Sequence, residues 1–363
     1  MSIIIHPRPG PLAAAMYTLR DLDADVIVLH GPSGCCFRPA RLLETDGVNV
    51  VTTAMTDDDF VFGAEPKLVE VLKRVDEIFH PRLIGVVGSC ASMIIGEDLK
   101  KAATKAGIAP KAICCSVHSG SGSGDNTFGA IMVLKEAAEM GFITRGEFER
   151  QRSMLVMATE LERKRGTARC EYLPNLPGDS PQAAAEELVR LAAQGARIDC
   201  ILNAKKETAF LYADALIAVS ALERKTGARV RKIANLDPSV GLPRIRSYST
   251  TIMARLRSLN IEIDHMTGGL DEYPLTGIRA KEILLKEPPD IVVIAGIPHA
   301  VEVEGFVRSV AVTVGTRAAS NLKSLGYTYV VADRDAHAVS LGPNKRIQPS
   351  FFGNALRKAV EAL

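Results

Sequence analysis

The sequence lacks several patterns that would place it in a large functional class. No part of its 363 residues forms an uninterrupted apolar run of about 18 residues, which a membrane-spanning helix requires. Lysine and arginine do not cluster with aromatic residues between them, and the formal net charge is only +2, so we expect neither a membrane nor a nucleic acid as partner. The first residues lack a basic segment followed by a long apolar one. We therefore expect a soluble, cytoplasmic protein without a signal peptide.

A repeated pattern of short apolar runs, turns and amphipathic segments is present instead, and it predicts an α/β fold. Near-continuous apolar runs without alternation are typical of parallel strands that are buried on both faces. Amphipathic helices are predicted between such runs, for example at residues 66–79 and 96–107. The first four strand-like runs are residues 24–30, 48–54, 82–89 and 111–117.

The chain is longer than a single hydrophobic core usually supports, so we expect three small Rossmann-like domains with parallel sheets. The first domain, residues 1–165, ends in a charged helical stretch that begins near Phe128. The second domain, residues 166–225, contains a further apolar run at 215–220. The third domain, residues 226–363, ends in a C-terminal helix and has strand-like runs at 228–236, 261–269, 290–296 and 327–335.

Cysteine is present, but none of the seven cysteines forms a CxxC pair. Cys170 and Cys200 stand in apolar strand-like runs, where we interpret them as small buried hydrophobic side chains. Cys35 and Cys90 each follow a predicted strand of the first domain, in HGPSGCC and GSCASM. Because ligands of parallel sheets lie beyond the carboxyl ends of the strands, we expect these two thiols to meet at one edge. Such glycine-rich turns suit an iron-sulfur cluster, and two unrelated buried thiols are the alternative.

No nucleotide-binding fingerprint is present. The glycine-rich stretch HSGSGSGDN, residues 118–126, follows a predicted strand and precedes a helix, but it matches neither GxGxxG nor GxxxxGK[ST]. A nicotinamide-dependent oxidoreductase is therefore disfavoured. We expect this loop to face a metal cluster or a substrate.

Four segments, in their order and spacing, resemble the first domain of the nitrogenase component 1 family. They are HGPSGC, DDDFVFGAEPKL, GSCASMIIGEDL and ICCSVHSGSGSGDNTFGAIMVL. In that family a histidine-glycine turn ends in a ligand cysteine, a second ligand cysteine precedes an acidic turn, and a glycine loop leads into a helix. The resemblance is strong over residues 24–140 and looser through the rest, and it implies a nitrogenase component 1-like fold.

The resemblance places Cys35 and Cys90 where the family holds its bridging iron-sulfur cluster, with Gly34 and Gly88 in the supporting turns. Cys36 is an adjacent thiol, and which of the two neighbours binds iron stays open, with Cys35 preferred. Larger family members have a third cysteine in the segment that reads HPRPGPLAAA here, where none is present. Two thiolates cannot close a four-iron cluster that takes four. We therefore expect a homodimer that shares one [4Fe-4S] cluster between two subunits.

The resemblance also implies an activity. Short members of the family act on tetrapyrroles, and the likeness extends to methanogen enzymes that reduce Ni-sirohydrochlorin a,c-diamide and close its lactam ring, a step toward the nickel coenzyme of methane formation. There, an ATP-hydrolysing iron-sulfur protein that resembles nitrogenase reductase delivers single electrons. We expect a Ni-containing tetrapyrrole as substrate, with ATP used by the partner and not by this chain. The alternatives are another chlorin-type reductase subunit and a non-catalytic scaffold for metal-cluster maturation.

A tetrapyrrole of this kind is a flat apolar macrocycle with several carboxylates, so its site needs apolar walls and a cationic rim. Arginine and lysine residues near the predicted crevice are candidates for that rim, with Arg38 preferred, and a solvated surface position is the alternative for each. They are Arg38, Arg41, Lys205, Lys206, Arg244 and Arg246.

Reduction of the ring also needs protons, which histidine or carboxylate side chains in strand-end turns can supply. His30, His118 and Asp57 are the candidate catalytic residues, and His299, in AGIPHA, occupies a similar turn and is a candidate both for proton donation and for contact with the substrate. A histidine at a strand end has the alternative of a structural hydrogen bond. The aspartate run 57–59 has two alternatives, which are to cap the helix that begins near residue 66 or to face water.

Overall fold

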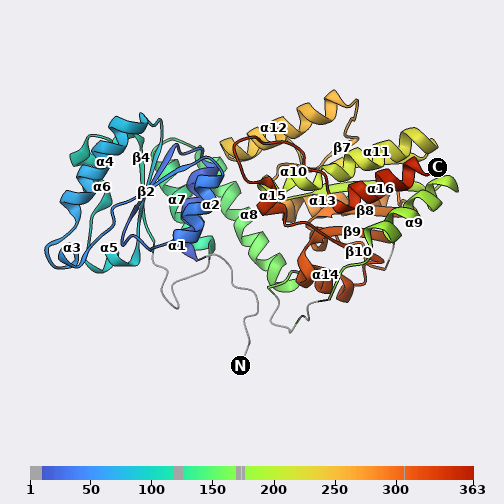
Figure 1. Cartoon of the computed structure of the whole chain (residues 1–363), viewed down its shortest axis with the longest axis horizontal. Coiled ribbons are helices and arrows are strands. Elements are labelled where there is room, and N and C mark those ends of the chain that lie inside the picture. Colours follow the sequence, from blue (N-terminus) through green and yellow to red (C-terminus); the bar gives the residue numbers. More distant parts are fainter. Residues whose placement is uncertain (1–9, 118–125, 169–172, 174–175, 306) are drawn as a thin grey trace. The chain divides into compact units, whose positions relative to one another are not determined.

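The chain folds into two compact units, which we call the N-terminal unit and the C-terminal unit (Figure 1). The computed structural model describes residues 10–117, 126–168, 173, 176–305 and 307–363. Within this part of the chain, the N-terminal unit comprises residues 10–155 with Leu242–Arg244, and the C-terminal unit comprises the rest. Each unit has a parallel sheet with helices on both faces, which confirms the α/β class. None of the described helices has the length and apolar character needed to cross a bilayer.

The N-terminal unit is built on a four-stranded parallel sheet of order β2-β1-β3-β4. Its strands are β1 (Val26–His30), β2 (Asn49–Thr52), β3 (Ile84–Gly88) and β4 (Ala112–Ser116). β1 and β3 are buried along their whole length, as their unbroken apolar runs require. Each strand lies inside one of the four runs predicted from the sequence, so these predictions are confirmed.

One face of this sheet is covered by α4 (Glu65–Phe79) and α6 (Leu99–Ala106). Leu68, Leu72 and Leu99 join the strand residues there in a continuous hydrophobic core. Burial of this apolar surface is the main force that holds the two helices on the sheet.

The opposite face is covered by α1 (Pro11–Asp21) and α7 (Asn126–Glu139), which pack against each other. α1 approaches the strands so closely that a Cβ atom at Gly85 of β3 would lie 2.4 Å from Leu19 Cδ1. The close packing therefore depends on glycine at this point of the strand. The remaining helices of the unit are α2 (Phe37–Thr45), α3 (Asp57–Phe62), α5 (Cys90–Ile94) and α8 (Arg145–Lys164). Of these, α8 continues into the C-terminal unit.

The C-terminal unit has a six-stranded parallel sheet of order β10-β9-β8-β5-β6-β7. Its strands are β5 (Arg197–Asn203), β6 (Arg229–Ala234), β7 (His265–Met266), β8 (Ile291–Gly296), β9 (Arg308–Val314) and β10 (Tyr329–Asp333). Counted along the chain from β5, the strands run 3-2-1-4-5-6 across the sheet, which is the order of dinucleotide-binding sheets. β5 and β8 therefore lie at the centre, where the direction of the connections reverses.

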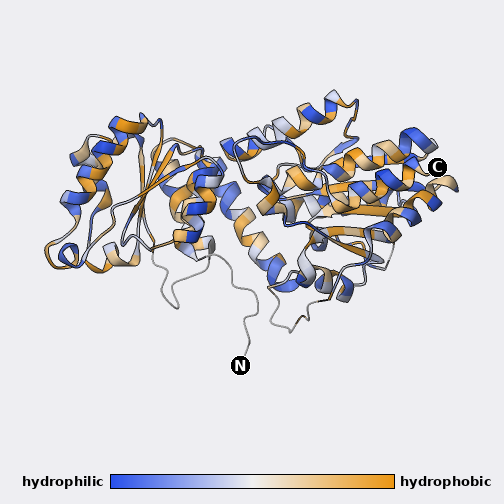
Figure 2. Ribbon diagram, in the orientation of Figure 1, coloured by the Kyte–Doolittle hydropathy of each residue, from blue (hydrophilic) through white to orange (hydrophobic). Residues whose placement is uncertain are grey.

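Helices cover both faces of this sheet as well (Figure 1). α13 (Tyr273–Lys286) and α14 (Gly315–Ser324) contribute Ala280, Leu284 and Leu322 to the core on one face. Figure 2 shows the hydrophobic residues of both units concentrated on the strands and on the helix sides that face them. The other helices are α9 (Pro181–Ala193), α10 (Ala209–Tyr212), α11 (Asp214–Thr226), α12 (Pro243–Ser258), α15 (Ala336–Ser340) and α16 (Phe351–Glu361), with short 3-10 turns η1 (Ala109–Lys111), η2 (Lys206–Thr208) and η3 (Pro298–Ala300).

The structure divides the chain differently from the three domains that we expected. The boundary between residues 225 and 226 falls inside a single sheet, because β5 and β6 are hydrogen-bonded neighbours. Residues 166–225 and 226–363 therefore belong to one unit. The first boundary also lies earlier than residue 165, at Val156 within α8.

Candidate functional site

Both sheets have a topological switch point, which is where ligands of open α/β sheets bind. In the N-terminal unit it lies between β1 and β3, whose following turns carry Cys35, Cys36 and Cys90. In the C-terminal unit it lies between β5 and β8, whose following turns carry Lys205 and His299. Cys35, Cys90, Lys205 and His299, four of the predicted residues, thus stand at the two places that the topology favours.

Three thiols gather at the carboxyl end of the first sheet, and we call Cys35, Cys36 and Cys90 the thiol edge. All three are partly exposed, and none of them forms a disulfide bond. Cys36 has a φ of 51°, in the left-handed region, directly before α2 begins. Cys90 is the first residue of α5 and lies near enough to Cys36 to act electrostatically on its thiol.

A glycine brings the two turns of the thiol edge together. A Cβ atom at Gly31 would lie 2.4 Å from Ser89 Oγ, in the residue before Cys90, and 3.9 Å from Cys35 Cβ. The backbones are also joined directly, because Ser89 N donates a hydrogen bond of 3.0 Å to the carbonyl oxygen of His30. Only a residue without a Cβ atom permits this approach.

The two adjacent thiols differ in acidity. The Cys36 thiol donates a hydrogen bond to Cys35, which lowers the pKa of Cys35 to about 7. The same hydrogen bond, together with burial, raises the pKa of Cys36. Cys35 is therefore the thiolate of the pair near neutral pH, and thiolate is the form that binds metals. This difference favours Cys35 over Cys36 as an iron ligand.

The other described cysteines lie inside the sheets. Cys114 and Cys115 are buried in β4, and Cys200 is buried in β5. Burial raises the pKa of all three thiols to about 12. The interpretation of Cys200 as a small buried hydrophobic residue is confirmed, whereas Cys170 lies outside the described residues.

His30 is fully buried at the end of β1. Its Nδ1 lies 3.0 Å from Thr53 Oγ1, and its Nε2 lies 3.8 Å from Glu97 Oε2. Burial lowers the pKa of His30, which favours the neutral ring. The structure thus gives His30 a supporting position beneath the thiol turn, in place of the substrate-facing position that we expected. His118, the other histidine predicted to be catalytic, lies outside the described residues.

Asp57 is exposed in the first turn of α3. In the same turn Asp59 accepts hydrogen bonds from the backbone and hydroxyl of Thr56, at 2.7 and 3.0 Å, and forms an ion pair with Lys67. These contacts lower the pKa of Asp59, and the hydrogen bond with Lys67 has the largest effect. Asp59 therefore caps α3, Asp57 and Asp58 face the solvent, and the run does not cap the helix that begins near residue 66.

The glycines and arginines predicted beside the thiols occupy different surroundings. Gly34 is exposed in the thiol turn, and a Cβ atom there would meet nothing within 4 Å. Gly88 ends β3, where a Cβ atom would lie 2.8 Å from a serine hydroxyl. Arg38 and Arg41 are exposed on α2, and Arg41 forms an ion pair with Glu44. Arg38 stands in the first turn of α2, two residues after Cys36.

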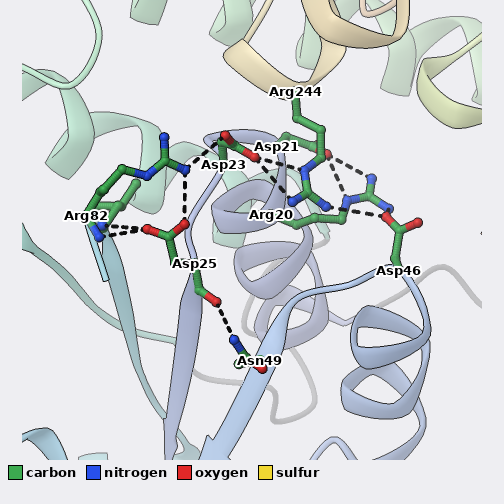
Figure 3. Close-up of polar contacts among 9 residues, drawn as sticks. Arg20, Asp21, Asp23, Asp25, Asp46, Asn49, Arg82 and Arg244 are labelled. Carbon is green, nitrogen blue, oxygen red and sulfur yellow. Dashed lines mark hydrogen bonds and ion pairs between the residues drawn. The ribbon is translucent and has the colours of Figure 1, made fainter. Parts of the chain in front are cut away.

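Arg244, expected at the rim of a substrate site, belongs instead to an ion-pair network at the amino end of the first sheet (Figure 3). Its guanidinium lies 3.2 Å from Asp23 and 3.6 Å from Asp46. Asp46 is buried and is also paired with Arg20. Because its charge is already paired at the edge opposite the thiols, Arg244 is not available to a substrate carboxylate, and this expectation is corrected. Arg246, which belongs to the C-terminal unit, is exposed on α12.

Buried amides organise the switch point of the C-terminal unit. Asn203, the last residue of β5, donates to the Tyr273 carbonyl oxygen over 3.1 Å and accepts from Thr276 Oγ1 over 2.6 Å. These bonds fix the start of α13 beside the turn that carries Lys205 and Lys206. Both lysines are partly exposed, and Lys205 Nζ lies 5.6 Å from the centroid of the Tyr273 ring.

His299 forms a pair with a residue that the sequence analysis did not identify. Its Nε2 lies 3.1 Å from Glu162 Oε1, and the hydroxyl of Tyr273 lies 3.4 Å from the same oxygen. Glu162 stands near the end of α8, 137 positions before His299. No local motif marks it, because its role follows only from the packing of α8 against η3 and α13.

The α/β fold with its thiol edge agrees with a family model described as "Nitrogenase component 1 type Oxidoreductase", which matches residues 10–236. The chain belongs to this nitrogenase component 1 type family, which confirms the resemblance inferred from the sequence.

Three relatives match the chain over nearly their whole length, and each is named "Ni-sirohydrochlorin a,c-diamide reductive cyclase complex, component CfbD". The protein from Methanothermobacter thermautotrophicus is 51% identical over 359 residues, which cover 98% of this chain and 99% of that protein. The protein from Methanocaldococcus jannaschii is 44% identical, with 99% and 100% covered. The protein from Methanosarcina acetivorans is 41% identical, with 99% and 98% covered.

Proposed function

We propose that this chain is the catalytic component of a reductive cyclase that reduces Ni-sirohydrochlorin a,c-diamide and closes its lactam ring. The observation that carries the proposal is the 51% identity to the relative of that name, over 98% of this chain and 99% of the relative. Because the match spans both chains almost completely, it includes both units and both switch points. The product would be a precursor of a nickel-containing coenzyme.

The thiol edge fits one half of an iron-sulfur cluster site. Cys35 and Cys90 would hold the cluster, since they stand at one switch point on partly exposed turns and Cys35 is the thiolate of its turn. Backbone amides of the turns that contain Gly34 and Gly88 are available to hydrogen-bond its sulfides. A bound cluster would supply one-electron transfer at a low potential.

A second copy of the chain would complete the site, and we propose a homodimer that shares one [4Fe-4S] cluster. Such a cluster takes four thiolates, and in the described part of the chain no group of three or more His, Cys, Asp or Glu side chains is placed to hold a metal. Large apolar side chains follow the same strand ends and are between 65% and 84% exposed, which supports a protein partner at this edge. They are Phe37, Val61, Phe62 and Ile94.

The remaining parts of the proposal concern the electron donor and the substrate. An ATP-hydrolysing iron-sulfur protein that resembles nitrogenase reductase would deliver electrons singly, and this chain carries neither nucleotide fingerprint in its sequence. Arg38 at the thiol edge is the cation that we propose for a carboxylate of the macrocycle, and Lys205 and Lys206 after β5 are the alternative candidates. Tetrapyrroles of another chlorin type are the alternative substrate class.

An anaerobic turnover assay tests the function. The purified chain is mixed with a nitrogenase-reductase-like protein from a methanogen, ATP and Ni-sirohydrochlorin a,c-diamide, and the absorbance of the tetrapyrrole is followed. We expect a spectral change that requires all three additions, with the reduced product identified by mass spectrometry. If the tetrapyrrole is unchanged and the cluster is transferred to an acceptor protein, the chain is a scaffold for cluster maturation and not an enzyme.

The cysteine assignment is tested on protein purified without oxygen. Cys35→Ser and Cys90→Ser should lose iron and colour, because each removes a ligand. Cys36→Ser is the matched control, since it changes the adjacent thiol but keeps a hydroxyl donor beside Cys35, and it should retain both. Full colour in Cys90→Ser would contradict the assignment.

A further inference from the structure

The backbone turn that carries His299 is held from two sides. Arg165 Nε donates a hydrogen bond of 3.0 Å to the His299 carbonyl oxygen. The hydroxyl of Tyr327 lies 2.6 Å from the carbonyl oxygen of Pro298 and 2.7 Å from that of Val301. A turn fixed in this way holds its side chain in a defined direction, as a site for chemistry requires.

The His299–Glu162 pair differs from a surface ion pair because it is mostly buried. The side chains of His299 and Glu162 are 13% and 17% exposed. The unit contains a second pair of the same kind, His337 and Glu207, at 3.0 Å, but the His337 side chain is 62% exposed. A pair that faces water contributes little, whereas a mostly buried pair with a small open area can orient a ring toward a ligand.

We propose that His299 is a catalytic acid that protonates the macrocycle and that Glu162 is its positioning residue. The proposal rests on the function proposed above. An ionised carboxylate only accepts hydrogen bonds, so Nε2 of His299 carries the hydrogen that Glu162 binds, and Nδ1 is the atom that exchanges a proton. Within the described residues His299 Nδ1 has no hydrogen-bond partner. Its position at the β5/β8 switch point is where a ligand of this sheet binds.

The proposed step balances as follows. Reduction of one C=C bond of the macrocycle breaks the π bond and forms two C–H bonds, which takes two electrons and two protons. The iron-sulfur reductase supplies the electrons singly. The His299 imidazolium releases its Nδ1 proton to a ring carbon and becomes neutral imidazole, and a hydronium ion from the solvent restores the imidazolium before the next transfer. Glu162 keeps Nε2 protonated and the ring in one orientation throughout.

Charged and titratable groups face the pair from each element packed against it. α8 contributes Glu162 itself and lies next to Arg165, which pairs with Glu302 and Glu304 beyond η3. α13 contributes the Tyr273 hydroxyl. The turn after β5 contributes Lys205, above the Tyr273 ring. The pH dependence of turnover would therefore report His299 within this set of groups.

Turnover by the reconstituted complex tests the proposal with four variants. His299→Gln should lower the turnover rate about 100-fold, the size expected for loss of a general acid, and should remove the alkaline limb of the pH profile. Glu162→Gln should lower the rate about 10-fold, and Glu162→Asp should restore part of it. His337→Gln is the matched control and should leave the rate unchanged. Iron content and thermal unfolding should match the wild type in all four, which separates a chemical effect from misfolding.

A second readout does not depend on turnover. In protein labelled with 15N at histidine, the His299 signal is assigned by its loss in His299→Gln, and metal-free sirohydrochlorin is then added. We expect this signal to shift and the His337 signal to stay. A wild type that does not turn over would overturn the proposed function, and the His299 signal would still decide the site. A wild-type rate in folded His299→Gln, or an unmoved His299 signal, would overturn the present proposal.

Discussion

One hydrogen bond separates two neighbouring cysteines in their chemistry. Cys35 and Cys36 are adjacent and both partly exposed, but only Cys35 is made more acidic, because the Cys36 thiol donates to it. Alkylating reagents attack the thiolate and not the thiol. The acidity of Cys35 is therefore measurable without a bound cluster.

We predict that iodoacetamide labels Cys35 before Cys36 in cluster-free protein, at a rate that rises as the pH passes about 7. Below that pH the thiol is protonated and unreactive, and above it the thiolate dominates. Peptide mass spectrometry over a pH series measures the rate at each cysteine. Cys36→Ala removes the donor, so the rise should move to higher pH, and an unmoved midpoint would contradict the role of this hydrogen bond.

A second prediction at this scale concerns the glycine between the two turns. Gly31→Ala should destabilise the protein by about 1–3 kcal/mol, the usual cost of overpacking, because the new Cβ atom would lie 2.4 Å from Ser89 Oγ. Gly34→Ala is the matched control, since a Cβ atom there meets nothing within 4 Å. Denaturant unfolding compares the two variants. Equal stability of the two would show that the turns can separate at no cost.

Single residues were predictable from the sequence where a local pattern marks them. Cys35 and Cys90 follow apolar runs in glycine-rich turns, so both the strand and its end could be recognised. Glu162 could not be recognised, because it lies on a charged helix and meets His299 only across 137 positions of chain. Arg244 was placed wrongly for a related reason. Arg244 forms ion pairs with Asp23 and Asp46, and the spacing of residues in the sequence does not show that these distant segments are in contact.

At the scale of elements, one buried amide joins three loops at the carboxyl end of the second sheet. Asn235 Oδ1 accepts from Ala204 N over 3.0 Å. Its Nδ2 lies 2.8 Å from the Ala204 carbonyl oxygen and 3.3 Å from that of Gly269. The loops after β5, β6 and β7 are thereby connected beneath the surface, next to the turn of Lys205.

Asn235→Ala should therefore destabilise the protein by about 2–4 kcal/mol, because it removes these bonds and leaves buried backbone groups unsatisfied. Thermal unfolding followed by circular dichroism measures the change. Asn354, exposed on α16, offers the control, and Asn354→Ala should change stability by less than about 0.5 kcal/mol. If Asn235→Ala loses no more stability than the control, the Asn235 side chain does not stabilise these loops.

Several strands were predictable because their apolar runs are unbroken, as in β1, β3 and β8, but the equally unbroken run at 215–220 lies in α11 and is helical. β9 escaped prediction, because its sequence RSVAVTV mixes serine, alanine and threonine with valine although five of its residues are buried. The number of units could not be predicted from the sequence, for a different reason. The runs that form β5 and β6 do not tell whether they pair in one sheet or lie in two, since that choice depends on hydrogen bonds between strands.

At the scale of the whole molecule, the proposed shared cluster makes the two copies depend on each other. We predict that a mixed dimer of one wild-type copy and one Cys35→Ser/Cys90→Ser copy contains no cluster, because only two of four thiolates remain. Co-expression with two different tags and sequential purification isolates this species, and its iron content is compared with that of wild-type dimers. A mixed dimer with half of the wild-type iron would mean that each copy holds a cluster of its own.

Gly31 and Gly296 each lie at the carboxyl end of a strand beside a switch point, Gly31 directly after β1 and Gly296 as the last residue of β8. A Cβ atom at Gly296 would lie 2.4 Å from the carbonyl oxygen of Asn203, and its φ is 117°. Neither glycine carries a reactive atom, yet each stands where diverging chain segments must nearly touch. A saturation mutagenesis screen should therefore find that both positions tolerate few substitutions. Residues without reactive side chains would then indicate the two sites as clearly as cysteine and histidine do.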